Sequence, residues 1–272
     1  MANKIAIVIP ARFGSTRLPG KPLKLIAGKE MLSRVAMIAK SVCDNRTDCT
    51  YIVATDDSRI VDFCGTNNVP VAMTAETCQS GTERSWDALG ALDFTPELIV
   101  NLQGDNPLCP PWFIEELITA WERDPHAQVL TPYIQLSWDE LDRLREAKKV
   151  TPFSGTTVVV DKESYALAFS KNIIPAIRKE KSLRSKMAQS PAKRHIGLYA
   201  YTYSALKEYF TLPVSPYEEF EGLEQMRFLH NNVPVKMVQV DYRGYGSMSG
   251  VDSPEDILRA EAMIEKYGEF PL

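Results

Sequence analysis

The chain has 272 residues, of which 44% are hydrophobic and 24% are charged, and its formal net charge is −4. This composition is ordinary for a globular protein, and the acidic balance argues against a broad nucleic-acid-binding face, which needs clustered basic residues. No stretch approaches the ~20 consecutive apolar residues of a membrane span, so we expect no membrane segment.

The cysteines and the N-terminus point to a cytoplasmic protein. The apolar run "IAIVIP" is too short for the hydrophobic region of a secretory leader. An odd number of cysteines without a C-x-x-C pair fits neither a disulfide framework nor a structural zinc site. A reducing compartment is the simplest interpretation. The five cysteines are Cys43, Cys49, Cys64, Cys78 and Cys109.

Short apolar runs alternate with helical patterns over the first half of the chain. The expected strands are 4–10, 51–57, 69–74 and 97–105, and the expected helices are 31–42, 58–64, 82–92 and one that begins near Pro111. This order predicts an α/β fold with a mostly parallel central sheet flanked by helices on both faces.

The second half is less regular. Strands are expected at 156–161, 196–203 and 233–241, and the second of these alternates in polarity as antiparallel strands often do. Between the first two lies "RKEKSLRSKMAQSPAKR", for which we predict a long surface loop, either a solvated linker or a lid over substrate. The last helix is expected at 253–268, because Ser253 and Pro254 suit its start and Gly268 its end.

No internal repeat or clear linker divides the sequence. We therefore expect one domain over 1–272, with a smaller inserted or appended lobe within about 150–220.

The loop after the first strand, "PARFGSTRLPGK", has the composition of a phosphate site. Arg12, Arg17 and Lys21 supply positive charge, and Gly14 and Gly20 let the backbone turn its N–H groups toward a ligand. In a parallel α/β sheet, ligands bind beyond the carboxyl ends of the strands, where this loop lies. It is not a P-loop, because five residues separate the glycines and Pro22 replaces the metal-binding hydroxyl.

Two aspartates agree with a phosphate ligand. Asp105 ends an apolar strand, and Asp252 stands just before the last helix. Carboxylates on separate elements suit Mg²⁺, which binds one or two carboxylates together with substrate phosphates. Either residue taken alone is more often a turn or capping aspartate, and that alternative stays open at this point.

Seven motifs, spread in order from residue 5 to about 265, carry a family resemblance. They are "IPARFGSTRLPGKPL", "ATDD", "CQSGTER", "NLQGDNP", "RHIGLYAY", "GLEQMRFL" and "SGVDSPED". Together they resemble the 3-deoxy-manno-octulosonate cytidylyltransferases (CMP-Kdo synthetases). The first motif is typical of sugar-acid cytidylyltransferases generally, whereas "QSGTER", "RHIGLY" and "LEQ" are more specific to the Kdo branch.

The resemblance implies a nucleotide-diphospho-sugar transferase fold of Rossmann-like type, whose smaller lobe makes a homodimer. It implies Mg²⁺-dependent transfer of CMP from CTP to the anomeric hydroxyl of Kdo, a 3-deoxy-2-ulosonic acid, with release of pyrophosphate, for lipopolysaccharide precursor synthesis. The implied catalytic residues are Arg12, Lys21, Asp105 and Asp252, of which Asp105 and Asp252 bind the metal. The implied nucleotide-binding residues are Pro10, Ala11, Arg12, Arg17, Lys21, Thr74, Gln79 and Ser80. The implied sugar-binding residues are Gln103, Arg178, His195, Tyr199, Glu224 and Gln225.

Some residues of these motifs and of the predicted helices have a competing structural interpretation. His195 could act as a general base or have a purely structural role beside its strand, but its motif favours a role in sugar binding. Arg84 could close a salt bridge rather than contact substrate. Trp86, Trp112 and Trp121 fall at helical positions that are typical of packing.

The chain departs from the family pattern around the sugar end. Thr157 stands where the family usually has lysine, and the segment after Pro175 is less acidic and aromatic. A variant acceptor, such as the 8-amino analogue of Kdo or a sialic-acid-like sugar, is therefore an alternative, because one polar contact can change specificity strongly. A non-catalytic nucleotide-binding protein is the minor alternative, against which the intact charged residues argue.

Overall fold

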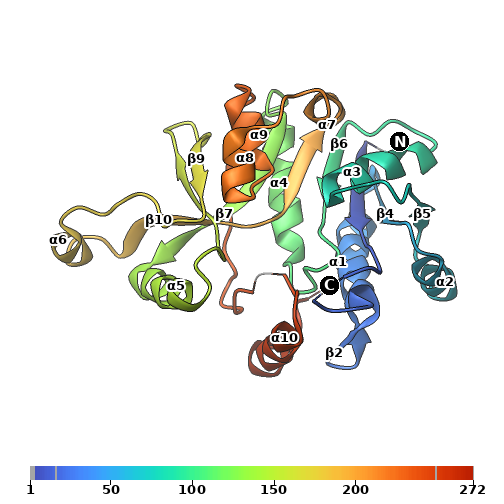
Figure 1. The fold of residues 1–272 in the computed structure, drawn as a ribbon, viewed down its shortest axis with the longest axis horizontal. Helices are drawn as coiled ribbons and strands as arrows, with labels where there is room; N and C mark the ends of the chain where they lie inside the picture. Colours follow the sequence, from blue (N-terminus) through green and yellow to red (C-terminus); the bar gives the residue numbers. More distant parts are fainter. Residues whose placement is uncertain (1–3, 16, 249, 272) are drawn as a thin grey trace. The chain divides into compact units, whose positions relative to one another are not determined.

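The computed structural model describes residues 4–15, 17–248 and 250–271, and their helices and strands are drawn in Figure 1. The chain divides into two compact units. Unit 1 comprises residues 1–118, 198–206 and 242–272, and unit 2 comprises 119–197 and 207–241. Thr16 and Ser249, which belong to two of the quoted motifs, lie outside the described residues.

Unit 1 contains the mostly parallel sheet that the sequence predicts. Its strand order is β5-β4-β1-β6-β11, in which the first four strands are parallel and β11 runs antiparallel to β6. The strands are β1 (Ile5–Pro10), β4 (Cys49–Thr55), β5 (Val71–Met73), β6 (Leu98–Asn101) and β11 (Tyr199–Thr202). All residues of β1 and β6 are buried, as expected for central strands covered on both faces.

Helices cover this sheet, and α1 and α3 both pack against β1 and β4. The helix α1 buries the five residues that its sequence period places on one face, which are Leu32, Val35, Ala36, Ala39 and Val42. The α-helices are α1 (Met31–Asp44), α2 (Ser58–Thr66), α3 (Gly81–Ala88), α4 (Pro111–Arg123), which begins in this unit, and α10 (Pro254–Tyr267). The short elements are η1 (Lys21–Leu23), β2 (Leu25–Ile26), β3 (Lys29–Glu30) and η2 (Leu89–Ala91).

The predicted ends of α10 are confirmed. The Ser253 hydroxyl accepts a hydrogen bond from the Asp256 backbone N–H, and the Asp256 carboxylate accepts one from the Ser253 backbone N–H. This capping box satisfies donors that the first helical turn cannot pair internally. At the other end, Gly268 takes a positive φ of 78°, which glycine adopts without steric cost.

Unit 2 is built around a largely antiparallel sheet. Here β7 pairs with β10 antiparallel and with β12 parallel, and β8 pairs antiparallel with both β10 and β9. The strands are β7 (Val129–Ser137), β8 (Thr157–Val160), β9 (Ala166–Ser170), β10 (Gln189–His195) and β12 (Val235–Gln239). The helices are α5 (Trp138–Val150), α6 (Glu180–Arg184), α7 (Tyr203–Tyr209), which begins in unit 1, α8 (Pro216–Glu221) and α9 (Gln225–His230).

The prediction of a long surface loop over 178–194 was wrong. The segment contains α6 and the strand β10, which pairs with both β7 and β8. Buried and more exposed residues alternate along most of β10, but the buried residues are Ser190, Ala192 and His195 rather than large apolar ones. A strand whose inner face is small or polar carries no hydrophobic signal, so tertiary pairing decided its structure.

Among the described residues, no helix combines the length and apolar character needed to cross a membrane.

Candidate functional site

The opening loop leaves β1 at the carboxyl end of the sheet of unit 1. Its glycines are not equivalent, because Gly20 has φ +67° and a Cβ there would lie 3.1 Å from the Phe13 ring, whereas Gly14 faces open space. The Arg59 guanidinium lies over the Phe13 ring in a cation–π contact, 3.5 Å from the ring centroid. Only Gly20 is therefore required by the backbone conformation of the loop.

Close backbone packing brings three of the quoted motifs together. A Cβ on Gly104 would lie 2.5 Å from the Pro10 carbonyl oxygen, so only glycine fits at that position. A Cβ on Gly81 would lie 3.1 Å from the Gln103 side-chain oxygen and 3.4 Å from the Pro10 ring. The first strand, the start of α3 and the turn after β6 therefore meet around Pro10. We did not single out Gly104 from the sequence, although a glycine between Gln103 and Asp105 is a signal of close approach.

The two predicted metal ligands lie beside one lysine. The Lys21 ammonium donates to the Asp105 carboxylate at 2.7 Å and to the Asp252 carboxylate at 3.0 Å. Arg17 adds an ion pair, with its guanidinium 3.2 Å from the second oxygen of Asp252. The structure thus brings together Lys21, Arg17, Asp105 and Asp252, four of the predicted residues, through side chains that remain partly exposed to a ligand.

Backbone contacts fix the relative position of the two aspartates. The Val251 N–H donates to the Asp105 carbonyl oxygen at 2.7 Å. A Cβ on Gly250 would come within 3.2 Å of the same carbonyl and of the Asp105 carboxylate. The Asp252 N–H donates to the Asp256 carboxylate at 2.9 Å, which ties it to the start of α10. These contacts support both carboxylates on structured backbone and not on a free loop.

The pair of carboxylates fits a divalent cation that shares its coordination with a substrate. One Lys21 ammonium reaches both, so a single positive charge can bridge them. Within 4–15, 17–248 and 250–271, no group of three or more His, Cys, Asp or Glu side chains could hold a metal by itself. Two carboxylates completed by phosphate oxygens and waters are typical of Mg²⁺ sites.

Two of the residues predicted to frame the nucleotide base, Thr74 and Ser80, are held in place by neighbouring residues. Arg84 is buried, and its guanidinium donates to the Thr74 hydroxyl at 2.6 Å and to the Asp56 carboxylate at 2.6 Å. The interpretation of Arg84 as a salt-bridge residue is therefore confirmed. Ser80 is the N-cap of α3, where its hydroxyl accepts from the Glu83 N–H at 3.1 Å.

Two other residues predicted to bind the nucleotide already use hydrogen-bond donors within the protein. The Ala11 N–H donates to the Ala54 carbonyl at 2.8 Å, and the Gln79 amide donates to the Thr77 carbonyl at 2.9 Å. The Arg12 and Gln79 side chains are exposed. The nucleotide roles of these residues stay predictions.

The predicted sugar residues fall in both units. In unit 1, Gln103 donates from its amide to the Asn101 side-chain oxygen at 3.0 Å. Asn101 is buried and stands opposite Tyr199 in the β6–β11 pairing. The Tyr199 ring stacks on Tyr201 with centroids 5.8 Å apart. Gln103, Asn101 and Tyr199 therefore occupy adjacent positions at the end of the sheet.

In unit 2, His195 is a buried neutral side chain. Its Nε2 lies 2.7 Å from the Thr131 hydroxyl, and the Phe169 ring packs edge-on at 5.1 Å. Burial, with a smaller contribution from the nearby charge of Lys171, lowers the pKa of His195 to about 3. A group with that pKa is a weak general base at neutral pH, so the geometry favours binding or structure over proton abstraction.

The other predicted sugar residues of unit 2 differ in accessibility. Arg178 is exposed, Glu224 is half-buried at the start of α9, and Gln225 is buried as its first residue. The helix α9 runs from Gln225 to His230. These observations leave their sugar roles as predictions.

Thr157 has a structural role that the sequence did not reveal. It is buried in β8, where its hydroxyl donates to the Asn172 carbonyl at 2.7 Å and accepts from the Ile174 N–H at 3.0 Å. The residue therefore anchors the chain that follows β9 and leads to Arg178.

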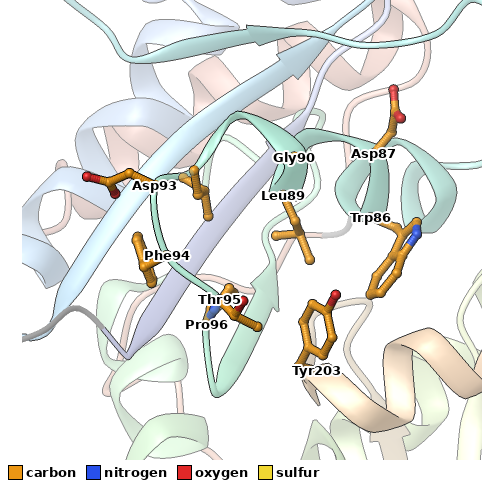
Figure 2. A pocket seen from close by; sticks show the side chains of 10 residues that line it. Trp86, Asp87, Leu89, Gly90, Asp93, Phe94, Thr95, Pro96 and Tyr203 are labelled. Atoms are coloured by element: carbon orange, nitrogen blue, oxygen red, sulfur yellow. The ribbon is translucent and has the colours of Figure 1, made fainter.

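A cavity of about 500 Å³ lies apart from these residues (Figure 2). It is lined by residues 86–87, 89–90, 92–96 and 203, none of which we predicted as a site residue. Trp86 and Tyr203 contact each other on its wall, with ring centroids 5.1 Å apart, as the packing interpretation of Trp86 expects. The cavity is not the predicted nucleotide site.

Comparison with known proteins agrees with the motifs. A family model described as cytidylyltransferase matches residues 6–237. A 3-deoxy-manno-octulosonate cytidylyltransferase of Maricaulis maris is 42% identical over 266 residues, covering 98% of this chain and 99% of that protein. A protein of the same name from Zea mays is 35% identical over 260 residues, covering 94% and 80%.

Solved structures give the same result for the fold. A CMP:2-keto-3-deoxy-manno-octonic acid synthetase complexed with CTP matches with a TM-score of 0.82 and 32% identity, over 97% of this chain and 99% of that one. A 4-diphosphocytidyl-2C-methyl-D-erythritol synthase from Anaerococcus prevotii, 15% identical over 97% and 99% with a TM-score of 0.57, shares the fold alone. The chain belongs to the cytidylyltransferase family and, within it, to the 3-deoxy-manno-octulosonate cytidylyltransferases.

Proposed function

We propose that this protein transfers CMP from CTP to the anomeric hydroxyl of Kdo and releases pyrophosphate. The observation that carries the proposal is the contact of one Lys21 ammonium with both Asp105 and Asp252, beside the cationic opening loop. Relatives that carry the name of this activity cover nearly the whole chain.

Attack of a hydroxyl on the α-phosphorus needs positioning and charge neutralisation more than covalent help. Arg12 and Arg17 are exposed cations on the loop and would bind the triphosphate. Lys21 would exchange its carboxylate partners for phosphate oxygens, because both ligands compete for the same ammonium. Arg84, fixed by Asp56, would hold Thr74 in place for the base.

Magnesium is part of the proposal, with Asp105 and Asp252 as its protein ligands. When bound, Mg²⁺ would neutralise charge on the phosphate oxygens. Lys21 competes with a cation for these carboxylates when no nucleotide is present. Calorimetry of Mn²⁺ with nucleotide-free protein should therefore show tighter binding to Lys21→Met than to the wild type, and a matched Lys24→Met variant should not differ. Equal affinity in Lys21→Met and wild type would contradict the shared site.

We propose a homodimer that uses unit 2. Exposed large apolar side chains concentrate on this unit, and such surfaces mark interaction sites when they are contiguous. The most exposed of those in unit 2 are Val150, Phe153, Leu167 and Phe220. Light scattering should give twice the chain mass for the wild type, and Phe153→Glu or Phe220→Glu should lower it. A monomeric wild type would overturn the proposed homodimer.

We also propose a cytoplasmic location, which the five free cysteines support.

Pyrophosphate release tests the activity directly. The assay contains CTP and Mg²⁺ with either Kdo or its 8-amino analogue, and it is repeated without each component. Release that needs all three components, with the higher kcat/KM for Kdo, would support the proposal. A higher kcat/KM for the amine would make the changes around Thr157 and Arg178 specificity determinants. No release with any 3-deoxy-ulosonic or sialic acid would overturn the proposal.

A further inference from the structure

Two cysteine side chains on different elements of unit 1 face each other. Cys43 lies near the end of α1 and Cys49 is the first residue of β4, and their sulfur atoms are 2.6 Å apart. A disulfide bond is about 2.05 Å long, so the atoms need to move only slightly to bond. Both side chains are half-buried and remain accessible to a small reagent.

The connection between the two residues is short and fixed. The Arg46 N–H donates to the Cys43 carbonyl at 3.0 Å, and the Arg46 guanidinium pairs with Asp48 at 3.1 Å. The Asp48 carbonyl accepts from the N–H groups of Lys4 and Ile5, at 2.8 and 3.0 Å. The sulfur contact is therefore made by two ordered elements and not by a loose loop.

The remaining cysteines lack this arrangement. Cys64 and Cys109 are buried, and burial raises the pKa of their thiols to about 11 and about 12. Cys78 is half-buried, and among the described residues its sulfur contacts no other cysteine. Two of the five cysteines are thus set apart by geometry, which the sequence spacing did not indicate.

We propose that Cys43 and Cys49 are a redox modification site, a dithiol that small-molecule disulfides convert reversibly into a disulfide linking α1 to β4. This inference does not depend on the proposed activity. Disulfides in reducing compartments are commonly transient and redox-sensing, which suits a reversible bond.

The chemistry balances with a disulfide such as oxidised glutathione as the oxidant. The Cys49 thiolate attacks one sulfur of the oxidant and expels one glutathione thiolate, which leaves a mixed disulfide on Cys49. Cys43 then loses its proton to water and attacks the Cys49 sulfur, which expels the second glutathione. Two protein thiols are oxidised and one glutathione disulfide is reduced to two glutathione thiols.

The contact between the two sulfur atoms also affects the acidity of Cys43. The hydrogen bond to Cys49 is the first cause that raises the pKa of Cys43, and burial is the second. A raised pKa lowers the fraction of Cys43 present as thiolate at neutral pH. Once Cys49 carries glutathione, the hydrogen bond between the two thiols is lost.

Mass spectrometry tests the proposal without an activity assay. The folded, reduced protein is treated with oxidised glutathione, quenched with N-ethylmaleimide under denaturing conditions, and digested with trypsin. Arg46 separates the two cysteines, so the bond would join "SVCDNR" to "TDCTYIVATDDSR" as one cross-linked species. We expect this species in the wild type and in Cys78→Ser, with two fewer maleimide adducts per chain and reversal by dithiothreitol.

Single variants separate this pair from general thiol reactivity. Cys43→Ser should accumulate glutathione on Cys49 and form no cross-link, and Cys43→Ala repeats the test should serine disturb folding. The oxidised wild type should melt about 2–6 °C higher than the reduced protein, because the bond restricts the unfolded chain. Five maleimide adducts at every glutathione ratio would overturn the proposal, and so would stable glutathione adducts on the wild type without a cross-link.

Discussion

Two groups of ion pairs, one in each unit, differ in how far their side chains are exposed. In unit 1 the Arg84 side chain is only 4% exposed and contacts Asp56, and the Lys21 side chain is 15% exposed and contacts Asp105 and Asp252. In unit 2 the cluster of Arg145, Arg184 and Glu180 lies on α5 and α6 with each side chain at least 24% exposed.

The effect on ionisation differs as well. Arg145 and then Arg184 lower the pKa of Glu180 to about 2, but water screens this partly exposed cluster. The deeply buried titratable group of unit 2, His195, is instead neutral. The comparison teaches that the ion pairs beside the nucleotide motifs of unit 1 use buried cations, whereas the cluster on α5 and α6 of unit 2 is open to solvent.

The largest expected effect lies in the shared carboxylate pair of unit 1. Asp252→Asn should lower kcat by about 100-fold or more, because a neutral amide cannot balance the cation at the phosphates. Steady-state pyrophosphate release measures it, and calorimetry of CTP checks that the variant still binds nucleotide. The exposed Asp62→Asn is the matched control. Turnover close to the wild-type value would remove Asp252 from the catalytic set.

Breaking one ion pair in each unit tests the comparison directly. Arg84→Met leaves the Asp56 carboxylate without its buried partner and should cost about 3 kcal/mol in the free energy of unfolding. Arg145→Met, in the partly exposed cluster of unit 2, should cost less than about 1 kcal/mol. Urea unfolding measures both. Equal losses would show that burial does not distinguish the two ion pairs.

The buried histidine predicts a pH dependence for unit 2. The pKa of His195 is about 3 when folded and 6.5 when unfolded, so between these values only the unfolded state binds the proton. The contribution of His195 to the free energy of unfolding is fully present above about pH 6.5 and is lost as the pH falls toward 3. At pH 5 the free energy of unfolding should be about 2 kcal/mol lower than at pH 7.

Urea midpoints from pH 5 to pH 8 measure this effect. The slope below pH 6.5 should decrease in His195→Gln and persist in His126→Gln, whose side chain is exposed. The same slope in wild type and His195→Gln would contradict a neutral buried histidine.

The smallest expected effect concerns Thr157. Thr157→Val keeps the shape of the side chain but removes the hydroxyl that bonds Asn172 and Ile174, so the free energy of unfolding should fall by about 1–2 kcal/mol. The ratio of kcat/KM for Kdo and its 8-amino analogue should stay unchanged if Thr157 only anchors the backbone. A changed ratio would give Thr157 a role in acceptor choice.

Much of unit 1 could be predicted because its signals are local. The apolar run of β1, the helical period of α1 and the capping residues of α10 each act within a few residues. In unit 2, the sequence pattern gave no strand at β10, because Ser190 and Ala192 face inward without a hydrophobic signal. The longest strand of that unit, β7, was not predicted either, and it carries Pro132, which argues against a central strand.

The sequence by itself determined the α/β class, the family and the identity of Arg17, Lys21, Asp105 and Asp252 as candidate site residues. Only the tertiary structure decided that Lys21 contacts both carboxylates, that Arg84 is used to hold Thr74, and that Cys43 meets Cys49. The reason is physical. Side-chain period and capping depend on neighbours in the chain, whereas these contacts depend on strand order and close packing at glycines such as Gly104, which join segments distant in sequence.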